Sequence, residues 1–279
     1  MLLACENPEK IAEMYKLAEE IKLAFYGNRI VMFAPLYLSN YCINGCVYCP
    51  YHAKNRHIAR KKLTQDEVRA EVTALQDLGH KRLAIEAGED PKNNPIEYIL
   101  ECLDTIYSVK HKNGAIRRAN VNIAATTVDE YRMLKNAGIG TYILFQETYH
   151  KANYNIYHPR GMKSKFEWRV NGFDRMGQAG VHSIGMGVLI GLEKEWRTDI
   201  CMMAYHLRYL QKHYWKTKYS VNFPRMRPSE NGGFQPNVIM SDRELAQVTF
   251  AMRIFDHDVD ISYSTREPAS YAITWLLWE

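Results

Sequence analysis

Three cysteines, Cys42, Cys46 and Cys49, lie within eight residues in the stretch "SNYCINGCVYCPYH". A zinc site with His52 as fourth ligand is one interpretation, but structural zinc sites usually combine two separated ligand pairs, and no second Cys/His pair follows here. Three buried thiols without a metal would not suit so polar a loop. The C-x3-C-x2-C spacing favours a 4Fe-4S cluster with three cysteine ligands and one open iron, to which a cofactor or substrate can bind.

The composition indicates a globular protein from a reducing compartment. Hydrophobic residues make up 47% of the 279 residues and charged residues 24%, and the mild net charge of +5 gives no reason to expect nucleic acid as a partner. Cys5, Cys102 and Cys201 are scattered and do not form a disulfide framework. We recognise no signal peptide and no apolar run long enough to span a membrane. We therefore expect a cytoplasmic protein without membrane contact.

Short apolar runs alternate with amphipathic stretches along the chain. The runs predict seven parallel strands, covered on both faces, at residues 29–40, 81–88, 119–126, 141–148, 182–192, 219–228 and 260–267. The stretches between them predict helices, three of which begin with capping boxes at Thr64, Thr127 and Ser241. Gly79 and Gly138 are typical of helix ends. The pattern predicts one α/β domain of repeating βα units.

A TIM-type (β/α) barrel is favoured over a doubly wound sheet, because polar residues follow several strands at the end where barrels place their active sites. These residues are Asn40, Glu89, Thr126, Glu147, Arg227 and Arg266. Only "PASYAITWLLWE" follows the seventh strand, which leaves no room for another strand with its helix. We therefore expect an incomplete barrel, without the eighth strand and the C-terminal region. The predicted parts are an N-terminal helix (1–28), a barrel domain (29–267) and a short C-terminal tail (268–279).

The cysteine motif, with Tyr48 just before its last cysteine, resembles that of radical S-adenosylmethionine enzymes. The resemblance implies that the amino and carboxylate groups of S-adenosylmethionine chelate the open iron. It also implies that the reduced cluster gives an electron to the sulfonium and releases a 5'-deoxyadenosyl radical, which takes hydrogen from a substrate. An electron donor such as flavodoxin or ferredoxin is then the expected protein partner.

Longer stretches resemble two related families of tyrosine lyases. The segments "APLYLSNYCINGCVYCPYHAKNRHIARKKLT", "LAIEAGEDP", "NVNIAATT" and "GTYILFQETYH" are similar to the lyase that matures FeFe-hydrogenases. The segments "GVLIGLEKEWRTD", "HYWKTKYSVNFPRMRP" and "YSTRE" are closer to 2-iminoacetate synthase of thiamine biosynthesis. The resemblance implies cleavage of the Cα–Cβ bond of L-tyrosine to 2-iminoacetate (dehydroglycine) and p-cresol.

Two other interpretations stay open. The chain could act on another aromatic amino acid, since relatives cleave tryptophan. It could also be an inactive iron–sulfur or zinc-binding relative, because full-length members have an eighth strand that helps to anchor the substrate carboxylate. In the hydrogenase maturase, the C-terminal region also holds a second cluster.

The resemblance also implies residues that hold S-adenosylmethionine. Gly88 and Glu89 resemble the Gly-Glu motif that binds its amino group, with a solvated acidic turn as the alternative. The Glu147 carboxylate could accept hydrogen bonds from the ribose hydroxyls of S-adenosylmethionine or from the substrate ammonium. The alternative is a salt bridge at the rim of the barrel. Arg169 is a candidate for the cofactor carboxylate, although helical arginines are more often surface residues. Tyr48 is expected to pack against adenine.

Arginines follow the sixth and seventh predicted strands. Arg225 and Arg227 end the sixth, and Arg266 ends the seventh between Thr265 and Glu267. A guanidinium group binds a carboxylate through two hydrogen bonds, so these three arginines are the candidates for catalytic contact with an amino-acid substrate. Internal ion pairs that stabilise the rim of the barrel are the alternative.

Overall fold

The computed structural model describes residues 1–227, 233–264, 266–268 and 270–271. Thr265 and most of the predicted tail, residues 269 and 272–279, lie outside the described residues. None of the helices in the described part combines the length and the apolar composition needed to cross a membrane.

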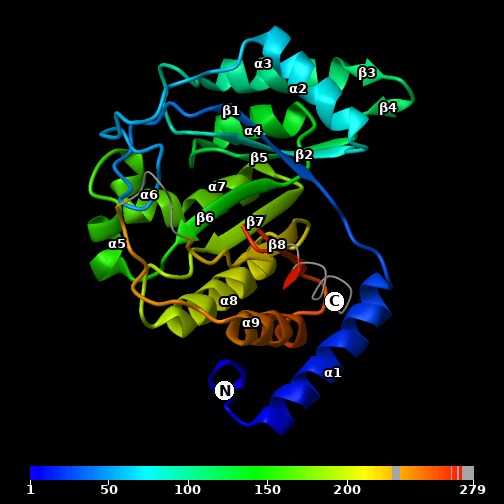
Figure 1. Ribbon diagram of the computed structural model, residues 1–279, viewed down its shortest axis with the longest axis vertical. Helices are drawn as coiled ribbons and strands as arrows, with labels where there is room; N and C mark the ends of the chain where they lie inside the picture. The colour runs from blue at the N-terminus through cyan, green and yellow to red at the C-terminus, as the bar shows by residue number, and fades with distance from the viewer. Residues whose placement is uncertain (228–232, 265, 269, 272–279) are drawn as a thin grey trace.

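One curled sheet of seven parallel strands forms the centre of the described part of the chain (Figure 1). The strands are β1 (Ala34–Ser39), β2 (Arg82–Ala87), β5 (Arg118–Asn122), β6 (Tyr142–Glu147), β7 (Ser183–Val188), β8 (Lys218–Asn222) and β9 (Asp260–Ser262). They pair in chain order, so β1 and β9 lie at the two edges. The expected α/β fold, an open barrel-like sheet of seven parallel strands in the described residues, is confirmed.

Helices follow most of the strands. They are α1 (Pro8–Tyr26), α2 (Gln65–Asp77), α3 (Ile96–Ser108), α4 (Val128–Asn136), α5 (Lys151–Tyr157), α6 (Phe166–Val170), α7 (Gly172–Ala179), α8 (Trp196–His213) and α9 (Asp242–Phe255). Two short 3-10 turns, η1 (Leu2–Ala4) and η2 (Met162–Ser164), and a small hairpin of β3 (Lys110–His111) and β4 (Gly114–Ala115) complete the described elements.

The predicted helix boundaries follow from local hydrogen bonding. The side chains of Thr64, Thr127 and Ser241 each accept a hydrogen bond from the backbone amide of a glutamate three residues later. The carboxylate of that glutamate in turn accepts a hydrogen bond from the backbone amide of the cap residue. Two of the amides that a helix start leaves unpaired are satisfied in this way. Gly79 and Gly138 adopt φ values of +89° and +79° just after α2 and α4, a conformation that favours glycine. The three capping boxes and both glycine stops are confirmed.

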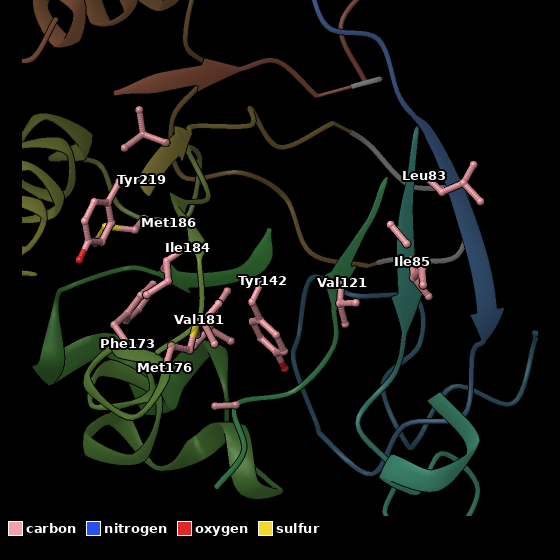
Figure 2. Close-up of a cluster of buried hydrophobic side chains, with 14 of the residues drawn as sticks. Leu83, Ile85, Val121, Tyr142, Phe173, Met176, Val181, Ile184, Met186 and Tyr219 are labelled. Atoms are coloured by element: carbon pink, nitrogen blue, oxygen red, sulfur yellow. The ribbon is translucent and has the colours of Figure 1, made fainter. Parts of the chain in front are cut away.

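Alternation along the strands separates an apolar face from a polar one. Leu83 and Ile85 on β2 and Val121 on β5 are completely buried in the main core (Figure 2). Successive strand side chains point to opposite faces, so Glu86 on β2 and its register partner Asn122 on β5 point away from that core. The inner face of the curled sheet therefore has polar side chains near the carboxyl ends of its strands.

The N-terminal helix packs on the last described helix. Asn7 caps α1 by accepting hydrogen bonds from the amides of Glu9 and Lys10, and Pro8 occupies its first turn. Met14 and Ala18 pack against α9, in a cluster that includes Phe250. The packing joins the N-terminal helix to the helix that precedes β9.

Candidate cluster and cofactor site

The cysteine loop begins directly after β1. Cys42, Cys46 and Cys49 are all free thiols; the side chain of Cys46 is buried and the other two are partly buried. The backbone amide of Cys49 donates to the carbonyl of Cys46 at 3.3 Å, and that of His52 donates to the carbonyl of Cys49 at 3.1 Å. A run of tight turns thus places the thiols at the carboxyl end of the first strand, where the sequence predicts the site.

The loop after β2 lies against the cysteine loop. A Cβ atom at Gly88 would lie 2.9 Å from the Cβ of Cys42 and still closer to the carbonyl oxygen of Tyr41. The Asn94 side-chain amide donates to the carbonyls of both Tyr41, at 3.0 Å, and Gly88, at 2.7 Å. Glycine is therefore required at this position by the close approach of two backbones, which gives a physical reason for the glycine of the Gly-Glu motif.

Asn44 connects the cysteine loop to both of its neighbours. Its side-chain amide donates to the Glu89 carboxylate at 2.6 Å, and its side-chain oxygen accepts from the backbone amide of Lys163 at 3.1 Å. Asn44 is 2% exposed, so its loss would leave several buried polar groups without partners. Sequence reasoning missed this positioning residue, although a polar residue between two predicted ligands was a signal. It also did not predict that Glu89 bonds to the loop.

Glu147 forms a buried ion pair with Lys163. The Lys163 ammonium lies 2.6 Å from a carboxylate oxygen of Glu147, and both side chains are almost fully buried. Burial acts to raise the pKa of Glu147, but the Lys163 ammonium and the Arg169 guanidinium outweigh it, so the pKa lies below its ordinary value. The geometry matches the salt-bridged alternative for Glu147. Its φ of +71° is also uncommon for a residue other than glycine.

Arg169 is buried, in contrast to most helical arginines. It is 5% exposed, and its Nε donates to the carbonyl of Phe145 at 2.9 Å. Glu147 ends β6 and Arg169 lies in α6, in the connection that follows, and the two influence each other electrostatically. Two residues implied by the family resemblance are therefore neighbours in one buried charged group.

Tyr48 points its hydroxyl toward His158. The Tyr48 hydroxyl lies 2.9 Å from Nε2 of His158, whose Nδ1 lies 2.9 Å from the carbonyl of Tyr154. A carbonyl only accepts, so Nδ1 of a neutral imidazole donates to it and Nε2 accepts from Tyr48. Burial lowers the pKa of His158 to about 3, which keeps the ring neutral. Sequence reasoning did not select His158.

The donor set fits an iron–sulfur cluster. Burial raises the pKa of Cys46 and raises that of Cys49 to about 11, and each neighbouring thiolate would raise them further. A bound cluster would supply the positive charge that thiolates need in such surroundings. Three sulfur donors on one loop match three irons of a cube. Within the described residues, no group of three or more His, Cys, Asp or Glu side chains has the geometry of a site for a single metal ion.

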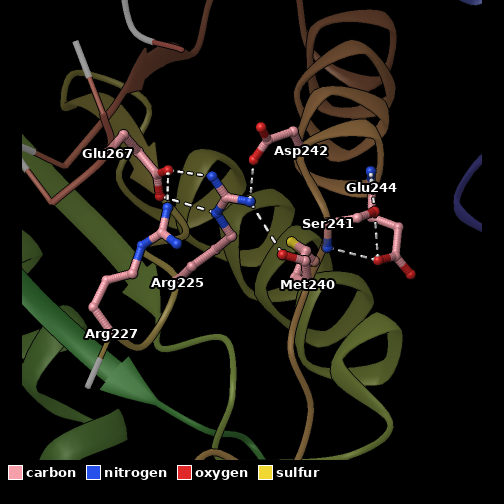
Figure 3. A network of polar contacts seen from close by, with 7 residues as sticks. All are labelled: Arg225, Arg227, Met240, Ser241, Asp242, Glu244 and Glu267. Carbon is pink, nitrogen blue, oxygen red and sulfur yellow. Dashed lines mark hydrogen bonds and ion pairs between the residues drawn. The ribbon is translucent and has the colours of Figure 1, made fainter. Parts of the chain in front are cut away.

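Arg225 forms an internal ion-pair network (Figure 3). Its guanidinium donates to both carboxylate oxygens of Glu267, to Asp242 at 2.6 Å and to the carbonyl of Met240 at 3.1 Å. Arg227 shares the Glu267 carboxylate at 2.8 Å, and its side chain is 40% exposed. All three nitrogens of Arg225 are thus bonded within the chain, which matches the ion-pair alternative, whereas the Arg227 side chain is partly exposed.

Arg266 acts on a carboxyl group across the inner face of the sheet. Arg266 is exposed, and its backbone amide donates to the Ser264 hydroxyl at 3.2 Å. Burial raises the pKa of Glu86 to about 7, although the Asn122 amide, which donates to it at 2.8 Å, and the Arg266 charge both lower that pKa. Sequence reasoning missed Glu86; its signal was a carboxylate inside the apolar run "RLAIEA".

Comparison with known proteins identifies the superfamily. The model of the radical SAM superfamily matches residues 36–204. The 2-iminoacetate synthase of Escherichia coli (strain K12) is 37% identical over 257 residues, which cover 92% of this chain and 66% of that protein. The crystal structure of HydG, a maturase of the [FeFe]-hydrogenase, is 44% identical with a TM-score of 0.95, and the match covers 99% of this chain and 61% of that chain.

Two further structures have the same fold. HydG from Carboxydothermus hydrogenoformans is 36% identical with a TM-score of 0.92, and the match covers 99% of this chain and 63% of that one. The methylornithine synthase PylB is 20% identical with a TM-score of 0.68 over 96% of this chain and 81% of that one, which shows the fold alone. This chain spans less than two thirds of the length of the synthase and of both HydG proteins. With the family model matching over half of its residues, the chain belongs to the radical S-adenosylmethionine superfamily.

Proposed function

We propose that this chain is a radical S-adenosylmethionine lyase that cleaves the Cα–Cβ bond of L-tyrosine to 2-iminoacetate and p-cresol. The main support is the 44% identity to HydG over 99% of the chain, together with the 37% identity to a 2-iminoacetate synthase. The two matches cover 99% and 92% of the chain. The product would feed thiamine thiazole synthesis or the assembly of the FeFe-hydrogenase cofactor.

Superfamily membership implies a 4Fe-4S cluster and S-adenosylmethionine, and we assign the ligands from this chain. Cys42, Cys46 and Cys49 would hold the cluster, and Gly88 and Glu89 would hold the amino group of S-adenosylmethionine. When bound, the two groups supply a 5'-deoxyadenosyl radical that removes hydrogen from the substrate. Asn44 is bonded to Glu89, so the cysteine loop and the cofactor-binding loop would move as one unit.

Charged residues on the other side of the site would position the cofactor and substrate. Glu147 and Arg169 form part of a buried charged group and would face S-adenosylmethionine, with Tyr48 packing against its adenine. Of the three arginines after β8 and β9, Arg227 and Arg266 are exposed. We therefore assign these two to the carboxylate of tyrosine. Arg225 would act as a positioning residue, because it holds Glu267, which in turn holds Arg227.

The contribution of these residues is orientation and exclusion of water. Holding a substrate bond in line with a reactive group accounts for much of the acceleration in enzymes whose cofactor supplies the chemistry. A tyrosine bound in the wrong orientation would therefore not be cleaved. Arg227 and Arg266 would fix the carboxylate, which determines how the amino group and side chain of tyrosine are placed.

Anaerobic reconstitution tests the proposal. The purified chain is treated with iron and sulfide, then given S-adenosylmethionine, dithionite and tyrosine, and 5'-deoxyadenosine and p-cresol are measured. We expect both products from the unchanged chain and neither from Cys46→Ser. Formation of 5'-deoxyadenosine without p-cresol would overturn the tyrosine assignment and leave radical chemistry intact; a parallel reaction with tryptophan then tests the other aromatic substrate.

A further inference from the structure

Two segments without acidic residues meet at the cysteine loop. Residues 21–65 contain seven Lys or Arg and no Asp or Glu, and residues 148–166 contain four Lys or Arg and no Asp or Glu. The whole chain has 31 acidic residues among 279, so the longer segment would contain about five if they were spread evenly. The second segment reaches the cysteine loop through the amide of Gly45, which donates to the carbonyl of Arg160 at 3.0 Å.

The basic part of the first segment is held firmly to the cysteine loop. The Arg60 guanidinium donates to four backbone carbonyls, those of Asn40, Tyr51, His52 and Asn55, at 2.5–3.1 Å. The amide of Ala53 donates to the carbonyl of Asn44, inside the cysteine motif, at 2.8 Å. The backbone of this segment therefore keeps a fixed position relative to the cysteine loop.

Some of the positive charges are neutralised and others are not. Lys61, Lys151 and Lys163 form ion pairs with Glu67, Glu167 and Glu147. Lys54, Arg56 and Arg160 are exposed, and among the described residues no ion pair or side-chain hydrogen bond involves them. We call these three residues the basic surface. Their charge is available to a partner from solution.

An apolar residue of the cysteine motif is also exposed, two residues before Gly45, whose amide bonds to Arg160. Ile43, between Cys42 and Asn44, is 36% exposed although its backbone amide is bonded to the carbonyl of Glu89 at 2.8 Å. The Glu89 and Asp90 carboxylates nearby accept hydrogen bonds from Asn44 and from Asn93. Ile43 thus adds exposed apolar surface to the loop, and the two acidic groups beside it are bonded within the chain.

We propose that the basic surface and Ile43 form the docking site of an acidic one-electron carrier protein, such as a flavodoxin or a ferredoxin. This inference rests on the proposed function, since radical chemistry of that kind requires a reductant. The carrier would lose one electron to the cluster that Cys42, Cys46 and Cys49 would hold, and that step would involve neither a proton nor a covalent bond. Weak electron-transfer complexes have small interfaces, and opposite charges guide their encounter.

A charge reversal tests the docking site directly. Binding of a purified flavodoxin to the chain is measured by calorimetry at low and at high salt for the unchanged protein, for K54E/R56E, and for K110E/K212E. The control variant changes the net charge equally, but its exposed lysines lie before β5 and β8, at the opposite ends of the strands. We expect K54E/R56E to weaken binding about 10-fold or more at low salt and the control to weaken it far less. The difference should shrink at high salt.

Equal affinities of the two variants, or no flavodoxin binding by the unchanged protein, would overturn the docking site. Product formation then separates this proposal from the proposed function. With saturating dithionite in place of flavodoxin, K54E/R56E should form 5'-deoxyadenosine at the unchanged rate; an equal loss with both reductants would show that these charges serve the site itself. If dithionite gives no p-cresol even with the unchanged protein, the lyase proposal fails while the binding measurement still tests docking.

Discussion

At the scale of single residues, the site depends on close approaches that leave no room for a larger side chain. Gly88 follows β2 and lies directly against the cysteine loop. A Cβ atom at this position would clash with both Tyr41 and Cys42. Overpacking of this kind typically costs about 1–3 kcal/mol. Because the cost falls on the loop that presents the thiols, it is expected to appear as poor metal binding before it appears as unfolding.

Gly88→Ala is therefore predicted to lower the iron content after anaerobic reconstitution to less than about half that of the unchanged chain. The reason is that the overpacking cost exceeds the thermal energy, so the loop would spend much of its time out of its binding conformation. Iron and sulfide are measured per chain. Gly233→Ala is the matched control, since a Cβ atom at Gly233 would meet nothing within 4 Å. Equal iron contents of the two variants would mean that the loops separate easily.

Glu86 makes the stability of the chain depend on pH. Its pKa is about 7 in the folded chain against an ordinary value of 4.5. The folded form therefore binds more protons between these two values, and stability falls as the pH rises from about 4.5 to about 7. Glu86→Gln removes this slope, so the variant is predicted to be more stable than the unchanged chain at pH 8, by on the order of 2 kcal/mol, and similar to it near pH 5.

Chemical denaturation of the cluster-free chain at pH 5 and pH 8 measures this effect. Glu101→Gln, at an exposed position of α3, is the control and should change stability by less than about 0.5 kcal/mol at either pH. A Glu86→Gln variant whose stability relative to the unchanged chain is the same at both pH values would contradict the raised pKa.

At the scale of elements, short-range sequence patterns determine the helix boundaries. The capping box of α4 joins Thr127 and Glu130, and loss of an N-cap hydroxyl costs about 1 kcal/mol. Thr127→Ala is therefore predicted to destabilise the chain by about 1 kcal/mol in denaturant unfolding. Thr73→Ala, inside α2, is the control: its hydroxyl bonds back to the carbonyl of Arg69, and alanine has the higher helix propensity, so stability should stay equal or rise.

The parts of the site that could be predicted from the sequence are those encoded by residues close together in the chain. The cysteine spacing and the Gly-Glu pair are local patterns, and their residues lie together at the ends of β1 and β2. The paired register of Glu86 and Asn122 and the bonds from Asn44 to Glu89 and Lys163 depend on contacts between distant segments. No single segment contains that information, so these partners could not be predicted.

Burial was also hard to predict from one segment. Arg169 lies in a short helix and is buried, and its guanidinium reaches back to the carbonyl of Phe145 in β6. The β3–β4 hairpin was missed as well, although Asn113 and Gly114 form a dipeptide typical of tight turns between strands. In that case a local signal was present and was not used.

At the scale of the whole molecule, the buried Arg225 network joins the segment after β8 to the start of α9 and the segment after β9. Glu267 is 1% exposed at its side chain and accepts from both Arg225 and Arg227. Removing one partner of a buried ion pair leaves a charge without compensation and typically costs about 3–5 kcal/mol. Asp242 still faces Arg225, so the lower end of that range applies.

Glu267→Gln is therefore predicted to lower the free energy of unfolding by about 3 kcal/mol. The exposed pair of Lys218 and Asp258 provides the control, because Asp258→Asn should cost at most about 1 kcal/mol. Denaturant unfolding of both variants at one pH makes the comparison. A Glu267→Gln variant no less stable than the control would show that this network contributes little to holding the sheet together.

The order of the strands has a consequence for how the polypeptide matures during synthesis. Each strand of the sheet pairs with the next one along the chain, so β1 and β2 can assemble soon after they leave the ribosome. One contact of the cysteine loop forms much later. The backbone amide of Lys163 donates a hydrogen bond to the side chain of Asn44, so this contact can form only after Lys163 has been made. For more than a hundred residues of translation the nascent thiols would remain without that contact and open to oxidation.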